Sequence, residues 1–364
     1  MSVLPIPAPA LAHHSQTLFT AMKEWRAQKR VPPVLLITGL PGVGKRSMCY
    51  FLAQWILCER NGINSAEDEG PGLFGDAPAA APVATDIESD PVPCGECSNC
   101  QKALKGSWVD FTEITPEEED GALKIEQFRK LKASVGFGAH EGLYKVILIP
   151  QAERMTVQAA NSVLKLLEEP PRGWIFFLTA ADATLLLPTI VSRCQTLRLK
   201  PMPEKTLEEL LTLAQVDAAK IKPAAMLAQG SWTRAMEWAD PEHWDNRKRV
   251  IEFLKDPVPA LNGLVEWATQ EPSNFDRMLD QLENLVAELI RWSVAQPAVS
   301  PEKYAWKNTD ASGLLATLAR RETRAQWIEH AERLAKARQE LNLPINRKLL
   351  AQSLLLPLLP SAIR

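Results

Sequence analysis

The feature that most constrains this chain is an apolar run, residues 34–38, that leads directly into a glycine-rich turn. The turn follows the start of the pattern G-x-x-x-x-G-K-[ST], in which glycines let backbone N–H groups approach a phosphate while the lysine reaches the outer phosphates. The residues that match this pattern are Gly39, Gly42, Gly44 and Lys45. Strand, turn and a following helix over residues 46–57 predict an α/β phosphate-loop domain.

The position after the lysine departs from the pattern. It normally carries the hydroxyl that holds magnesium, and here it is Arg46, with Ser47 one residue further on. One residue rotates a helix by about 100°, so Ser47 does not reach the same point. We expect no magnesium site at this loop, and whether the loop still binds ATP stays open.

A second apolar run, residues 143–149, reads as another buried parallel strand. In phosphate-loop nucleotidases such a strand ends in acids that hold magnesium and orient the attacking water. Here Pro150 and Gln151 occupy those positions, and Glu153 follows in a turn, where we expect a solvated or helix-capping carboxylate. This second defect coincides with the first, and both predict a loss of hydrolysis.

Composition excludes several classes of protein. The 364 residues are 46% hydrophobic and 23% charged, as in ordinary soluble proteins, and allow two or three domains. A formal charge of −3 argues against a surface coated in basic residues. No apolar run is long enough to span a bilayer and the N-terminus lacks a signal-peptide pattern, so we expect a cytoplasmic protein without membrane contact.

Three cysteines are crowded into a C-x-x-C-x-x-C run, Cys94, Cys97 and Cys100. This spacing favours a metal ion over disulfides, and Cys58 is the expected fourth ligand of a tetrahedral zinc site. The alternative is a set of free thiols, which would oxidise readily in a short exposed loop. Cys49 is the weaker candidate for the fourth ligand, because its helical position suits a small buried side chain.

Between Cys58 and Cys94 the composition changes. Residues 60–93 are rich in Gly, Ala, Pro and Ser and contain a string of acids. Such a segment buries too little apolar surface to offset its conformational entropy, so we predict a disordered insertion. An acidic interaction segment is the functional alternative.

Further along, residues 161–171 read N-S-V-L-K-L-L-E-E-P-P, and a strand over 174–179 and the tripeptide 192–194 follow. In this order the motifs resemble the AAA+ domain of bacterial DNA polymerase III clamp-loader subunits, the gamma/tau and delta-prime subunits. The altered loop and the missing acids resemble the delta-prime subunits in particular. The resemblance covers residues 10–200 apart from the insertion, and it continues more weakly to the chain end.

The resemblance implies roles for single residues. Ser192, Arg193 and Cys194 match the family's arginine-finger motif, so Arg193 would act in trans on the ATP of a neighbouring gamma/tau subunit, where a guanidinium stabilises transition-state charge. Without the resemblance, Arg193 would be a surface arginine at a strand edge. Thr179 matches the first nucleotide sensor.

The resemblance also implies three domains. These are an AAA+ domain over residues 1–201, which includes the zinc module 94–105, a helical lid over 202–242 and an all-helical collar over 243–364. In the lid, Thr233 stands where active relatives carry a sensor arginine, and Arg234 comes one residue late, so we take Arg234 as a solvated helix residue. The leucine-rich segment 346–359 fits either a core or an oligomer contact.

These observations predict a non-hydrolysing scaffold subunit of the clamp loader. The implied partners are gamma/tau, delta and, through the assembly, the sliding clamp and primer-template DNA, with zinc as the structural cofactor. The alternative is an active clamp-loader ATPase in which Ser47 and Glu153 replace the lost groups. A third possibility, a zinc-containing DNA-binding module acting alone, conflicts with the near-neutral charge.

Overall fold

The computed structural model describes residues 8–61, 63, 90–118, 121–133, 138–295, 304, 306–341 and 345–359. Most of the predicted insertion, residues 62 and 64–89, lies outside this description. The chain divides into two compact units. The first comprises Met1–Leu213 with Gly230–Thr233, and the second comprises Ala214–Gln229 with Arg234–Arg364.

A five-stranded sheet forms the centre of the first unit. Every pair of neighbouring strands is parallel, and the order is β2-β3-β4-β1-β5. The strands are β1 (Val34–Thr38), β2 (Phe111–Glu113), β3 (Lys145–Ile149), β4 (Trp174–Ala180) and β5 (Gln195–Arg198). Strand β1 lies between β4 and β5, so the glycine-rich turn that follows it starts from an internal strand of the sheet.

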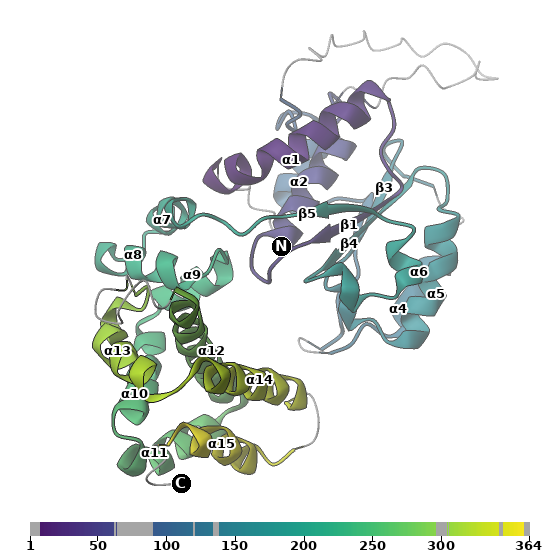
Figure 1. Ribbon diagram of the computed structural model, residues 1–364. Helices are drawn as coiled ribbons and strands as arrows, with labels where there is room; N and C mark the ends of the chain where they lie inside the picture. The colour runs from purple at the N-terminus through teal and green to yellow at the C-terminus, as the bar shows by residue number, and fades with distance from the viewer. Residues whose placement is uncertain are drawn as a thin grey trace, which may run out of the picture. The chain divides into compact units, whose positions relative to one another are not determined.

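Both faces of this sheet are covered by helices (Figure 1). On one face, alternate side chains of the central strands pack with α4 (Ile125–Ala133), α5 (Val157–Glu168) and α6 (Pro188–Val191). Helices α1 (Ala8–Ala27) and α2 (Lys45–Leu57) lie on the other side. Strands β1, β3 and β4 are buried along their whole length, which explains their unbroken apolar sequences.

The predicted parallel sheet with flanking helices is confirmed, and the differences are local. Helix α1 begins at Ala8 and precedes the first strand. Strand β5 was not expected, because only Leu197 of its four residues is buried. Two shorter helices complete the first unit, α3 (Ser98–Lys105) and α7 (Glu204–Leu213).

The second unit is helical, and the part of it that the structure describes contains no strand. Its α-helices are α8 (Ala218–Leu227), the body of α9 (Trp232–Ala239), α10 (Pro241–Lys255), α11 (Pro257–Gln270), α12 (Pro272–Ala295), α13 (Ser312–Arg321), α14 (Arg324–Glu340) and α15 (Arg347–Leu355). Leucine, tryptophan and phenylalanine side chains from α10 to α15 form one core. The mostly helical C-terminal half is confirmed.

A buried cation lies inside this helical unit. The side chain of Arg247 is 1% exposed, and its Nε lies 2.7 Å from Oδ2 of Asp310. Its terminal nitrogens donate to Asn308 at 2.6 Å and to Gln281 at 3.1 Å. Arg247 is thus paired with a carboxylate, and each of its three nitrogens has a hydrogen-bond partner, as expected for a buried charge. None of the described helices combines the length and apolar character that a bilayer crossing requires.

Candidate functional site

The glycine-rich turn connects β1 to α2 in a conformation that requires glycine. Gly42 and Gly44 have φ angles of +74° and +96°, which L side chains rarely adopt. A Cβ atom on Gly42 would lie 2.3 Å from Oγ of Ser231 and 2.8 Å from Thr233. The start of α9 therefore packs directly on the turn, and Thr233 occupies the place where the resemblance led us to look for a sensor arginine.

The lysine of the turn binds the turn itself. Nζ of Lys45 donates to the backbone carbonyl oxygens of Gly39 at 2.6 Å and Leu40 at 3.0 Å. Burial lowers the pKa of the Lys45 ammonium, and the nearby charge of Glu153 opposes that shift. The lysine is thus folded onto the loop carbonyls, and a phosphate would have to compete with them.

Arg46, at the position of the missing hydroxyl, forms an ion pair with Glu113 at the end of β2. Its Nε lies 2.7 Å from Oε1 and its Nη2 donates to Oε2 at 2.7 Å. The hydroxyl of Tyr50, one turn along α2, donates to the same Oε2 at 2.6 Å. Burial, and then the hydrogen bond and charge of Glu113, raise the pKa of Tyr50 to about 12. Arg46, which stands where a magnesium ligand is normally found, is therefore engaged in an ion pair with Glu113.

The end of β3 carries no carboxylate at the two expected positions. Gln151 adopts a left-handed φ of +48°, and its backbone N–H donates to Oγ1 of Thr179 at 2.9 Å. The side-chain hydroxyl of Thr179, matched to the first sensor, thereby accepts a hydrogen bond from a backbone N–H. Glu153 differs from expectation, since Oε1 accepts from the N–H of Ala181 at 3.1 Å and the buried Oε2 has no hydrogen-bond partner among the described residues. Glu153 is therefore neither fully solvated nor a helix cap.

The four cysteines Cys58, Cys94, Cys97 and Cys100 come together. Their Sγ atoms all lie within 4.8 Å of one another, and three of the four residues are buried. A zinc ion with about 2.3 Å bonds to four thiolates needs sulfur atoms about 3.8 Å apart, and Sγ of Cys94 and Cys100 are 3.9 Å apart. The cluster fits one tetrahedral zinc ion. Cys49 is fully buried within α2 and is not part of it.

Backbone donors point at this sulfur cluster. The N–H groups of Cys94, Cys97 and Cys100 donate to the Sγ atoms of Cys58, Cys94 and Cys97 at 3.5, 3.3 and 3.4 Å. Such bonds stabilise thiolates over thiols. A hydrogen bond from Cys100, opposed by burial, lowers the pKa of Cys58 to about 5. This favours a thiolate at Cys58, whereas the hydrogen bond to Cys58 and burial raise the pKa of Cys100, and burial raises the pKa of Cys97.

Arg193 lies at the surface of the first unit, just beyond α6. Its Nη2 is 2.5 Å from Oε1 of Glu168, and its Nη1 donates to the backbone oxygen of Thr189 at 2.6 Å and to Oγ of Ser192 at 3.2 Å. The side chain is 32% exposed. Cys194 packs beneath, with its Sγ donating to the carbonyl of Ile190. Arg193 is therefore held in one orientation by groups of its own unit.

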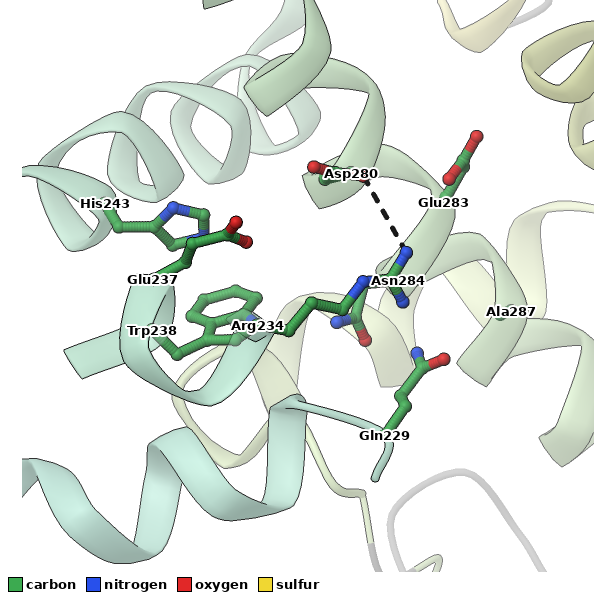
Figure 2. Close-up of a pocket in the computed structure, with 9 residues that line it drawn as sticks. All are labelled: Gln229, Arg234, Glu237, Trp238, His243, Asp280, Glu283, Asn284 and Ala287. Atoms are coloured by element: carbon green, nitrogen blue, oxygen red, sulfur yellow. Dashed lines mark ion pairs between the residues drawn. The ribbon is translucent and has the colours of Figure 1, made fainter. Parts of the chain in front are cut away.

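Arg234 lines a cavity of about 260 Å³ within the second unit (Figure 2). Its Nη2 lies 4.0 Å from Oδ1 of Asp280, and 45% of the side chain is exposed. Glu237 and Trp238 from α9 and Glu283 from α12 also line this space. Burial, followed by the charge of Asp280, raises the pKa of Glu237. Arg234 thus has a partner in its own unit.

Sequence reasoning missed three residues around the turn. Glu113 and Tyr50 fix Arg46, and Nε2 of His14 lies 3.3 Å from the carbonyl oxygen of Val43 in the turn. Of the three, only Glu113 could have been singled out from the sequence, because a carboxylate at the end of a strand in a buried sheet needs a cationic partner. The identity of that cation depended on tertiary structure.

Comparisons with known proteins identify relatives of this chain. Residues 77–203 match the family described as DNA polymerase III, delta subunit. DNA polymerase III subunit delta' of Yersinia pestis is 27% identical over 331 residues, covering 88% of this chain and 87% of the relative. The same subunit of Pseudomonas aeruginosa is 31% identical over 253 residues, covering 67% and 69%. A solved gamma subunit-related protein of Thermotoga maritima aligns at 15% identity and a TM-score of 0.40, covering 93% of this chain and 98% of that one.

The parallel sheet and the glycine-rich turn that follows β1 define an α/β phosphate-loop protein. Within that class, the chain belongs to the DNA polymerase III subunit delta' family.

Proposed function

We propose that this chain is a non-hydrolysing subunit of the DNA polymerase III clamp loader that supplies Arg193 to the ATP site of a neighbouring gamma/tau subunit. The observation that carries the proposal is the contrast between the two cations of the first unit. Arg46 is tied to Glu113 at the position of the metal ligand. Arg193 is displayed at the surface in one orientation.

The loop supports the absence of hydrolysis through three separate features. It has no hydroxyl at position 46, no acid at the end of β3, and a lysine bonded to loop carbonyls. Enzymes catalyse phosphoryl transfer mainly by positioning the reactants and by stabilising charge with a metal ion, and covalent chemistry by the protein contributes little. Loss of the magnesium site therefore removes most of the rate enhancement.

Arg193 suits action in trans because three acceptors align its guanidinium before any neighbour arrives. A positioned arginine next to a γ-phosphate contributes about 10³ to 10⁵ in rate in related systems. Glu168 holds one edge of the group through a half-exposed ion pair, which costs little to break. The ion pair with Glu168 would then be exchanged for a pair with phosphate.

The remaining parts of the proposal follow the family. Delta and gamma/tau subunits, the sliding clamp and primer-template DNA are the proposed partners, and the role in replication places the chain in the bacterial cytoplasm. The helical lid over 202–242 and the helical collar over 243–364 are proposed as the lid and oligomerisation domains. The cysteine cluster holds one structural zinc ion that pins the end of α2 to α3.

The test is the DNA-stimulated ATPase of an assembly of gamma/tau, delta and this chain. With Arg193→Ala we expect turnover at the adjoining site to be lost while the assembly still forms on gel filtration. Arg129→Ala, which removes an exposed arginine of the same unit, is the matched control and should leave the rate unchanged. Equal rates with wild type and Arg193→Ala would refute the trans role.

One observation favours a second candidate, a catalytically active ATPase. Oε2 of Glu153 is buried without a hydrogen-bond partner in the described part of the chain, and its charge acts on Lys45. A carboxylate in this state near the loop resembles a catalytic base. If Glu153 acts in this way, Glu153→Gln abolishes magnesium-dependent turnover by the isolated chain.

A further inference from the structure

A second cavity, of about 450 Å³, lies within the helical unit. It opens between α8, α10 and residues 307–310. Its volume is in the range of pockets that enclose small ligands or a few side chains. None of the roles proposed above uses this space.

The floor of the cavity is apolar. It is formed by Pro223, Leu227 and Trp244, and the exposed Ala219 and Pro241 line its mouth. The indole Nε1 of Trp244 donates to the carbonyl oxygen of Trp238 at 2.7 Å, and the two rings pack edge to face at 5.4 Å. This fixed aromatic side chain is a preorganised anchor for an apolar group.

The rim is positively charged overall. Lys220, Lys248 and Lys307 line it together with the two carboxylates Asp245 and Asp310. Asp245 is paired with Lys248 at 2.8 Å, and Asp310 is neutralised from beneath by the buried Arg247 at 2.7 Å. Nζ of Lys220 donates a long hydrogen bond of 3.4 Å to the carbonyl oxygen of Ala239. A ligand that brings carboxylates would therefore gain from the rim.

We propose that this cavity receives an acidic peptide segment of a partner protein, with an apolar side chain seated against Trp244 and flanking carboxylates near Lys220 and Lys307. The apolar floor and the cationic rim complement an acidic, hydrophobic segment. A nucleic-acid strand fits less well, because Asp245 and Asp310 would lie beside its continuous phosphates and the lining offers no arginine. The cavity is thus a docking site for a peptide.

The experiment selects short random peptides displayed on phage against the full-length chain. Enriched peptides should combine aspartate or glutamate with leucine or an aromatic residue. The strongest one is then synthesised with a fluorescent label, and its affinity is measured by anisotropy. Recovery of no peptide above background would overturn the proposal, as would enrichment of basic sequences.

Matched charge reversals locate the binding. Lys220→Glu with Lys248→Glu should weaken the peptide by about tenfold or more, because two favourable charges become repulsive. Lys222→Glu with Lys255→Glu makes the same charge change on the same two helices outside the cavity and should leave the affinity nearly unchanged. Equal weakening by both pairs would show general electrostatic attraction and refute the site.

A neutral change tests the apolar floor. Ala219→Phe fills the mouth of the cavity from an exposed position, and it should weaken the peptide by about tenfold without altering charge. Circular dichroism verifies that each variant keeps its helical content. Unchanged affinity in Ala219→Phe would refute the cavity as the site. A labelled oligothymidylate that competes with the peptide and binds more tightly would assign the surface to nucleic acid instead.

Discussion

The two ends of helix α2 differ in how their polar groups are satisfied. At the N-terminal end, Lys45 donates to loop carbonyls and Arg46 forms an ion pair with Glu113. Protein groups therefore bind the lysine that would contact a phosphate and the side chain that stands at the metal-ligand position. At the C-terminal end, Cys58 meets three other thiol groups, and backbone N–H groups point at their sulfur atoms. The difference teaches that charged side chains at the glycine-rich turn are held by groups of the protein itself, whereas the four sulfur atoms surround one point that a metal ion could occupy.

The largest expected effect concerns the cysteine cluster at the C-terminal end of α2. Cys58→Ser or Cys100→Ser should lose the zinc ion and with it part of the roughly 10 kcal/mol that structural zinc contributes in zinc-finger peptides. Native mass spectrometry and thermal unfolding measure both consequences. Cys194→Ser is the control, because Cys194 lies outside the cluster. The Cys194→Ser protein should keep one zinc ion. A Cys58→Ser protein with one full zinc ion would exclude Cys58 as a ligand.

A smaller effect concerns the packing behind the glycine-rich turn. Burial, with the neighbouring His13 adding to the shift, lowers the pKa of His14 from 6.5 to about 4. The unfolded chain therefore binds a proton more readily than the folded one between these values. The contribution of His14 to stability is complete above pH 6.5 and is lost as the pH falls towards 4, by at most about 3 kcal/mol.

Urea unfolding at several pH values measures this dependence. His14→Gln should flatten the slope between pH 4 and 6.5, the interval between the two pKa values. His140→Gln, at an exposed position, should leave the slope unchanged. If the two variants behaved alike, burial of His14 against the turn would not be the cause.

The smallest expected effect concerns the ion pair between Arg46 and Glu113 beside the glycine-rich turn. A double-mutant cycle of Arg46→Ala and Glu113→Ala should give a coupling free energy of about 1 to 2 kcal/mol, because Glu113 is only 14% exposed. The exposed pair Arg60–Glu96, with side chains 48% and 76% exposed, should give a clearly smaller coupling free energy because solvent screens it. A coupling at Arg46 no larger than this would mean that the ion pair does not fix the turn.

How far the sequence predicted this structure depended on whether the signal was local. The phosphate-loop turn and the strands β1 and β3 were predictable because glycine spacing and continuous apolar runs are read along the chain. Strand β5 was not, since it alternates little and buries one residue. Its place in the sheet comes from pairing with β1.

The same distinction holds for the candidate site. The choice of Cys58 over Cys49 came from spacing and helix character, and the cluster agrees with it. The partner of Arg46 was out of reach, because Glu113 lies 67 residues away and meets it only through the order of strands in the sheet. For Glu153, the expectation of a solvated group failed because the end of β4 packs over it.

The central claim is that this chain keeps the phosphate-loop fold without hydrolysing nucleotide. ATP turnover by the isolated full-length chain, measured with magnesium and compared with Lys45→Ala, tests it most directly. The account predicts equal, background rates for both proteins. Magnesium-dependent turnover that Lys45→Ala abolishes would contradict it.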